Sequence, residues 1–117
     1  MATFTKKLLS GSTNGQPIKI TVTTNGTAQT IHTAVLGVAS LDEVWLYAYN
    51  DSATAIGLTL LWGGTTEPDN KNFMFIPSKA GRLLIVDGQL LQNGLLVKAY
   101  ADTANVIILD GYVNNIS

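Results

Sequence analysis

The segment Glu43–Asn50, EVWLYAYN, decides the fold class of this chain. Successive side chains of an extended strand point to opposite faces, so the segment divides into two sets of alternating residues. One set is aliphatic and the other aromatic: Val44, Leu46 and Ala48, then Trp45, Tyr47 and Tyr49. Because neither set is polar, we expect the strand to be covered on both sides, by an opposing sheet and by a loop or neighbouring subunit.

Similar apolar and β-branched runs recur along the chain, separated by residues that favour turns. This pattern is typical of an all-β protein. It predicts a single-domain antiparallel β-sandwich, jelly-roll-like, with about eight strands. The predicted strands are Pro17–Thr24, Gln29–Val35, Glu43–Asn50, Ala55–Trp62, Asn72–Pro77, Arg82–Asp87, Leu95–Ala101 and Asn105–Asn114.

Turn residues supply the boundaries between these runs. The sequence Asn25-Gly26 within Thr24–Thr27 predicts a β-hairpin, and Asp87-Gly88 predicts the end of a strand. Helical spacing competes only over Ser40–Ala48 and Gln89–Lys98, and strands fit better. Residues 1–16, rich in Ser, Thr and Gly, are predicted to form an N-terminal arm or edge segment, followed by a β-sandwich domain over residues 17–117.

Composition excludes several classes of function. The 117 residues carry 7 Lys and Arg against 8 Asp and Glu, so no basic block is available for nucleic acid. Cysteine is absent, which excludes disulfides and thiol chemistry. No apolar run reaches the roughly 20 residues that cross a bilayer, and the first residues lack the apolar core of a signal peptide. We therefore expect a soluble protein made in a cytoplasm, without nucleic-acid or membrane partners.

No motif predicts catalysis or a cofactor. The single histidine, His32, lies in a predicted strand on the face opposite Ile31, where a structural role is favoured. No serine lies in a Gly-x-Ser-x-Gly elbow. We therefore predict a protein that is not an enzyme, with no catalytic residue, cofactor or metal.

The acidic residues are scattered. Glu67–Asn70 could supply oxygen ligands to calcium, but its spacing is not that of an EF-hand, which favours a solvated turn. The pair Asp42-Glu43 is predicted to be a solubilising strand edge. Asp110 interrupts the apolar last strand, where a buried carboxylate would need a partner such as Arg82 or Lys98.

The aromatic residues allow two interpretations. They could form the core and the contacts between subunits, which we favour, or an exposed platform that stacks on sugars. The residues concerned are Trp45, Tyr47, Tyr49, Trp62, Phe73, Phe75, Tyr100 and Tyr112.

Several segments together resemble a known class of proteins. The similarity is carried by Lys6–Gly15, Ile31–Ala34, Asp42–Leu46, Leu60–Thr66, Ala104–Val106 and Gly111–Asn114. In overall pattern and size the chain resembles the small structural proteins encoded in the head-gene modules of tailed bacteriophages. That resemblance implies a capsid decoration (cement) protein: a β-sandwich or jelly-roll module, often trimeric, which binds the outer capsid surface of the virion and bridges major capsid subunits.

The resemblance and the residue pattern lead to one functional prediction with alternatives. We expect self-association as a trimer through the doubly apolar strands. The N-terminal arm and the loops Gly63–Lys71 and Leu90–Gly94 are expected to contact the major capsid protein. The predicted interface residues are Trp45, Tyr47, Tyr49, Lys6, Lys7, Leu8, Leu9, Glu67 and Asp69. The alternatives are a phage neck, tail or fibre component, a carbohydrate-binding β-sandwich module and, last, a small virion-associated enzyme.

Overall fold

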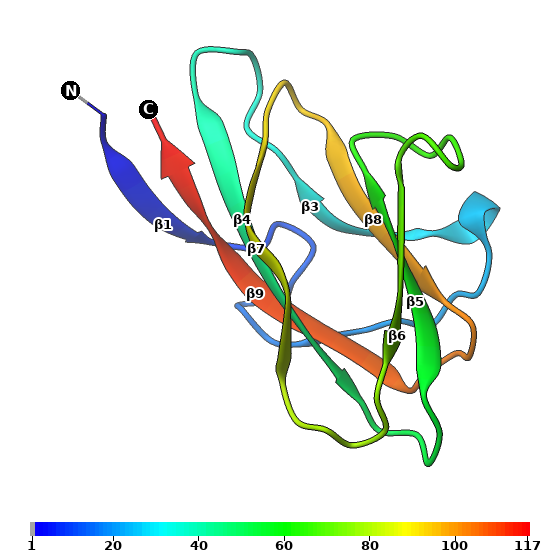
Figure 1. The fold of residues 1–117 in the computed structure, drawn as a ribbon. Helices are drawn as coiled ribbons and strands as arrows, with labels where there is room; N and C mark the ends of the chain where they lie inside the picture. The colour runs from blue at the N-terminus through cyan, green and yellow to red at the C-terminus, as the bar shows by residue number, and fades with distance from the viewer. Residues whose placement is uncertain (1) are drawn as a thin grey trace.

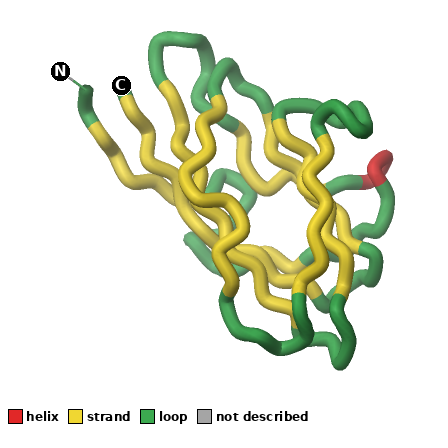
Figure 2. Tube along the Cα trace, in the orientation of Figure 1, coloured by secondary structure: helices red, strands yellow, loops and turns green. Residues whose placement is uncertain are grey.

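Two antiparallel β-sheets, which lie face to face in Figures 1 and 2, form the fold of residues 2–117 in the computed structural model. The strands over these residues are β1 Phe4–Leu8, β2 Ile18–Lys19, β3 Gln29–Thr33, β4 Leu41–Asn50, β5 Ile56–Trp62, β6 Lys71–Ile76, β7 Leu83–Leu91, β8 Leu96–Ala101 and β9 Ile107–Ile116. A single 3₁₀ turn, η1, covers Asn25–Thr27. These same residues contain no helix both long and apolar enough to span a membrane.

The order of the strands is that of a jelly roll. The first sheet has the order β1-β9-β4-β7, with β2 also paired to β9, and the second has the order β3-β8-β5-β6. Antiparallel pairs are nested from the outside of the chain inwards: β2 with β9, β3 with β8, β4 with β7 and β5 with β6. A jelly roll has this topology, because it is one long hairpin of nested strand pairs that is rolled into two packed sheets. The predicted jelly-roll-like β-sandwich is confirmed.

The hydrophobic core lies between the sheets and follows the alternation seen in the sequence. In β4 the even-numbered residues are buried and the odd-numbered ones are only half-buried, and β8 also alternates. Strand β5 does not alternate, because its outward-facing residues are buried as well. At Gly57 an added Cβ would meet the Phe73 ring, so the neighbouring strand's side chain covers this outer side.

Two predictions about turns are corrected. The hairpin at Asn25-Gly26 does not form, because β2 and β3 belong to different sheets and η1 lies on the connection between them. The strand predicted to end at Asp87 continues to Leu91. Gly88 has φ +89° beside a register shift in the β4–β7 pairing, so it forms a β-bulge that bends the strand without ending it.

The N-terminal segment contributes an edge strand to the first sheet. Strand β1 pairs antiparallel with the second half of β9, and every one of its side chains is exposed. The backbone N–H of Thr3 donates to Ser117 O at 2.7 Å, which brings the two ends of the chain together. Figure 1 shows this part of the sheet extending away from the second sheet, in a molecule of 47 × 28 × 21 Å.

Candidate functional site

The outer face of the first sheet carries a row of aromatic residues. Trp45 is paired with Tyr112 across β4 and β9, and their rings are stacked with centroids 6.2 Å apart and planes at 9°. The Trp45 Nε1–H donates to Glu43 Oε1 at 2.8 Å, and Asn114 Nδ2 donates to the same oxygen at 3.0 Å. These hydrogen bonds hold the indole in place along the sheet surface.

Cations from β1 and from the residue before β7 cover two tyrosines of this face. Lys6 Nζ lies 4.3 Å from the Tyr112 ring centroid, and the Arg82 guanidinium carbon lies 3.5 Å from that of Tyr47. Arg82 Nε also donates to both carboxylate oxygens of Asp110, at 2.8 and 2.9 Å. Cation–π contacts and this ion pair therefore partly cover an aromatic face that the sequence predicted to need a neighbouring molecule.

Asp110 pairs with one of its two predicted partners, but it lies on the outer face of the sheet and not in the core. The ion pair with Arg82 is confirmed, and Lys98 has no part in it. The carboxylate is not buried, however, because Asp110 pairs with Tyr47 on the outer face and is half-exposed. It therefore lacks the cost of a buried charge that the sequence analysis assigned to it.

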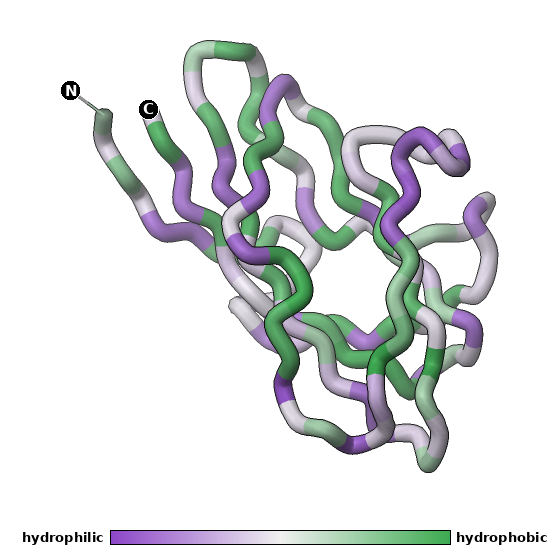
Figure 3. Tube along the Cα trace, in the orientation of Figure 1, coloured by the Kyte–Doolittle hydropathy of each residue, from purple (hydrophilic) through white to green (hydrophobic). Residues whose placement is uncertain are grey.

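A second exposed surface lies at the end of the sandwich where β3 leads into β4. In the β3–β4 loop, residues 34–40, Leu36 is 81% exposed and Val38 is 75% exposed. Figure 3 shows this loop as hydrophobic at its tip. The backbone N–H groups of Asn93 and Gly94 donate to Gly37 O and Val35 O, both at 2.9 Å, so the loop is held against the β7–β8 turn.

The β5–β6 loop is held through Glu67. Its carboxylate accepts hydrogen bonds from Tyr100 Oη at 2.6 Å and Asn25 Nδ2 at 2.8 Å, and forms an ion pair with Lys71 at 3.0 Å. The Tyr100 hydrogen bond is the main cause that lowers the pKa of Glu67 from 4.5 to about 2. Within residues 2–117, no three His, Cys or acidic side chains gather as metal ligands. Glu67 therefore holds the β5–β6 loop in place through these three contacts.

His32 belongs to a buried polar network between the two sheets. His32 and Asp42 are each only 4% exposed, and His32 Nε2 lies 2.8 Å from Asp42 Oδ2. The backbone N–H of Ser10 donates to His32 Nδ1 at 3.1 Å, so Nε2 carries the proton and donates to Asp42. The Ser10 hydroxyl oxygen accepts from the backbone N–H of Thr33 at 2.6 Å. The His32–Asp42 contact links β3 of the second sheet to β4 of the first sheet.

The structure corrects both residues of this His–Asp pair. A register shift in the β3–β8 pairing buries His32 together with Ile31, although strict alternation would have placed them on opposite faces. Asp42 is not a solubilising edge residue. It accepts hydrogen bonds from Asn115 Nδ2 at 2.9 Å and from the backbone N–H of Val35 at 3.0 Å. Burial would raise the pKa of Asp42, but the hydrogen bonds outweigh it and lower the pKa.

A signal in the sequence could have identified Asp42. The alternation that buries Val44, Leu46 and Ala48 also places Asp42 on the inner face of β4. An inward-facing carboxylate needs hydrogen-bond donors, which predicts a polar network. Its donor Asn115 comes from β9, and no sequence spacing connects the two residues.

The predicted interface residues do not form one surface. Trp45, Tyr47, Tyr49, Lys6 and Leu8 share the outer face of the first sheet. Lys7 lies on β1 with the opposite orientation. Glu67 and Asp69 belong to the β5–β6 loop. Leu9 is only 2% exposed and belongs to the core, so its predicted place in an interface is wrong.

The strand order of the two packed sheets assigns the chain to the jelly-roll β-sandwiches. No protein-family model matches it, and searches among curated proteins and solved structures find no match either.

Proposed function

We propose that this chain is a non-enzymatic structural protein of a tailed-bacteriophage virion. It acts as a capsid decoration protein that binds the outer capsid surface and bridges major capsid subunits. The jelly roll supplies a rigid module, and the resemblance of its sequence to head-module proteins suggests this setting. The observation that carries the proposal is the exposed apolar tip of the β3–β4 loop.

This tip has the properties of a docking surface. Leu36 and Val38 have the two largest exposed fractions among the exposed large apolar side chains of residues 2–117. The hydrogen bonds from the β7–β8 turn fix the backbone on which these side chains are carried. A preorganised loop loses little conformational entropy on binding, so its apolar side chains are suited to a pocket on another protein.

Other predicted contact segments lie near the same end. The backbone N–H of Gly63, where the β5–β6 loop begins, donates to Leu96 O at 2.8 Å beside the β7–β8 turn. The start of β1 pairs with the end of β9, which pairs with the start of β4, next to the apolar tip. Figure 1 shows both chain ends on this side. We propose that this end faces the capsid.

The proposal includes self-association as a trimer. The outer face of the first sheet is the proposed contact between copies, because exposed Phe4, Leu8 and Leu84 flank its aromatic row. Sedimentation velocity at micromolar concentration tests this part. A trimer is expected, and a monomer would contradict it.

Immunogold electron microscopy of particles purified from the source culture tests the location. Gold particles over the outer head surface are expected. Labelling of the neck, tail or fibres would replace the proposed role with another structural role, and particles without label would refute a virion role.

Binding of the purified chain to capsids stripped of it tests the apolar tip. The double variant Leu36→Ser/Val38→Ser is expected to bind the capsids at least about tenfold more weakly, because two exposed anchors are lost. Phe75→Ser is the control, since Phe75 is an exposed apolar residue on β6, outside the tip. Equal binding by the double variant and the control would refute the assigned contact.

A further inference from the structure

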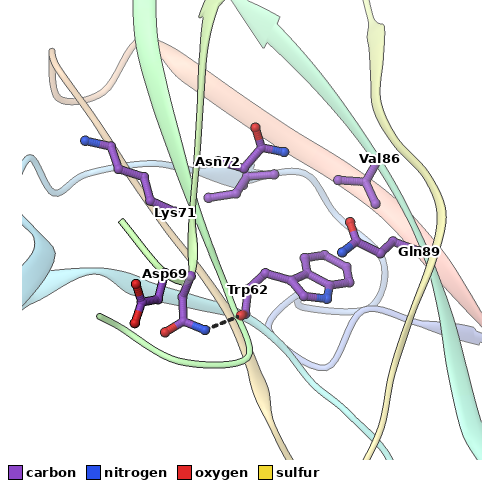
Figure 4. Close-up of a pocket in the computed structure, with 8 residues that line it drawn as sticks. Trp62, Asp69, Lys71, Asn72, Val86 and Gln89 are labelled. Atoms are coloured by element: carbon purple, nitrogen blue, oxygen red, sulfur yellow. Dashed lines mark hydrogen bonds between the residues drawn. The ribbon is translucent and has the colours of Figure 1, made fainter. Parts of the chain in front are cut away.

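A polar crevice opens between the edge strands of the two sheets. It has a volume of about 330 Å³, and its lining includes Trp62 of β5, Lys71 and Asn72 of β6, Val86 and Gln89 of β7, and Asp69 of the β5–β6 loop. The volume lies within the lower part of the range for small-molecule sites, roughly 300–1,000 Å³. Figure 4 shows Trp62, Asn72, Val86 and Gln89 around one space.

Strand register explains why polar groups face this space. Asn72 pairs with Leu60, and Gln89 pairs with Val44, both of which are core residues. Asn72 and Gln89 therefore lie on the inward-facing sides of β6 and β7, and both remain exposed because they lie at the open edge of the sandwich. The bulge at Gly88 lies directly beside Gln89 and sets the register of this part of β7.

The hydrogen-bonding groups of the crevice are available to a ligand. The side-chain amides of Asn72 and Gln89 and the indole N–H of Trp62 have no partner in the hydrogen bonds found among residues 2–117. Asn70, by contrast, donates through Nδ2 to Trp62 O at 2.9 Å, the bond drawn in Figure 4. The unpaired groups thus include two amides that donate and accept and one indole that donates.

We propose that this crevice binds a neutral pyranose unit of an oligosaccharide. Amides recognise sugar hydroxyls because each both donates and accepts, and the Trp62 ring supplies an apolar surface for the C–H groups of the sugar. Of the two charged side chains in the lining, the Lys71 ammonium is paired with Glu67, and the Asp69 carboxylate repels anions and can accept from sugar hydroxyls, so an anionic ligand is disfavoured. This inference goes beyond the decoration role and does not depend on it.

The crevice is a better candidate for a sugar site than the aromatic row on the first sheet, because the rings of that row are covered by cations. The Tyr112 and Tyr47 rings have Lys6 and Arg82 over their faces, and Arg82 is held there by Asp110. A sugar stacking on those rings would have to displace these cations. The Trp62 ring has no such cation among the contacts found within residues 2–117.

Tryptophan fluorescence separates the two sites, because the chain contains two tryptophans. The variant Trp45→Phe leaves Trp62 as the only tryptophan, and Trp62→Phe leaves Trp45. Cellotriose, maltotriose and xylotriose are titrated into each variant up to about 20 mM. A saturable change of emission with at least one sugar is expected in Trp45→Phe and not in Trp62→Phe.

Variants of the two crevice amides, made in the Trp45→Phe background, test whether these side chains bind the sugar. Asn72→Ala and Gln89→Ala are each expected to weaken binding by about two- to tenfold, the effect of one neutral hydrogen bond. Gln16→Ala is the control, because Gln16 is an exposed glutamine outside the crevice. Thermal unfolding of every variant verifies that it is folded.

Three outcomes would overturn the proposal. They are the absence of a saturable change in Trp45→Phe with all three sugars, a change confined to Trp62→Phe, and a change in Trp45→Phe that both amide variants leave intact. Because none of these experiments involves a capsid, a failure here leaves the decoration role unaffected.

Discussion

Removal of the Asp42 carboxylate tests how much its buried hydrogen bonds contribute to the free energy of unfolding. In Asp42→Ala three donors lose their acceptor: the His32 Nε2–H, the Asn115 amide and the backbone N–H of Val35. Each unsatisfied buried donor costs about 1–3 kcal/mol. Taking the lower value because Val35 is only half-buried, the expected loss is about 3 kcal/mol.

Urea unfolding at pH 7 is the assay. With a slope of about 1.5 kcal/mol per molar urea, a loss of about 3 kcal/mol lowers the unfolding midpoint by about 2 M. Asp87→Ala is the matched control, since Asp87 is an exposed aspartate on β7, and its expected change is within about 0.5 kcal/mol. A loss below about 1 kcal/mol for Asp42→Ala would show that water satisfies these donors and would refute the reasoning.

Three further predictions follow from other contacts. Because folding lowers the pKa of Asp42, the ionised carboxylate stabilises the fold; this stabilisation is complete above the unfolded pKa of 3.8 and is lost as the pH falls through the lower folded pKa. Urea midpoints should therefore fall less steeply between pH 7 and pH 3 in Asp42→Asn than in the parent chain. For Glu67, a ¹³C NMR titration of the carboxyl group should give a pKa of about 2 in the parent chain and a value nearer 4.5 in Tyr100→Phe, and equal values would show that the Tyr100 hydrogen bond is not the cause. Gly111→Ala should prevent normal folding, because the added Cβ would collide with the backbone oxygen of Trp45. Circular dichroism and gel filtration test this prediction. Gly26→Ala is the control, since nothing lies within 4 Å of a Cβ added there.

The sequence by itself determined the fold class. The period-two alternation in β4 and the regular recurrence of apolar runs are local properties of the chain, and each predicts a strand without knowledge of its neighbours. The sequence also named Arg82 as one of two possible partners of Asp110, although Asp110 is not buried as that prediction assumed.

Tertiary structure decided what each strand faces. The rolled topology joins β2 to β9 and separates β2 from β3, so a local Asn-Gly signal did not produce a hairpin. β-Bulges changed the facing of His32 and the length of β7, since one extra residue shifts the alternation of a strand. The His32–Asp42–Asn115 network and the crevice at Trp62 each unite residues from three strands. Such groups depend on distances across the folded chain, which spacing along the sequence does not determine.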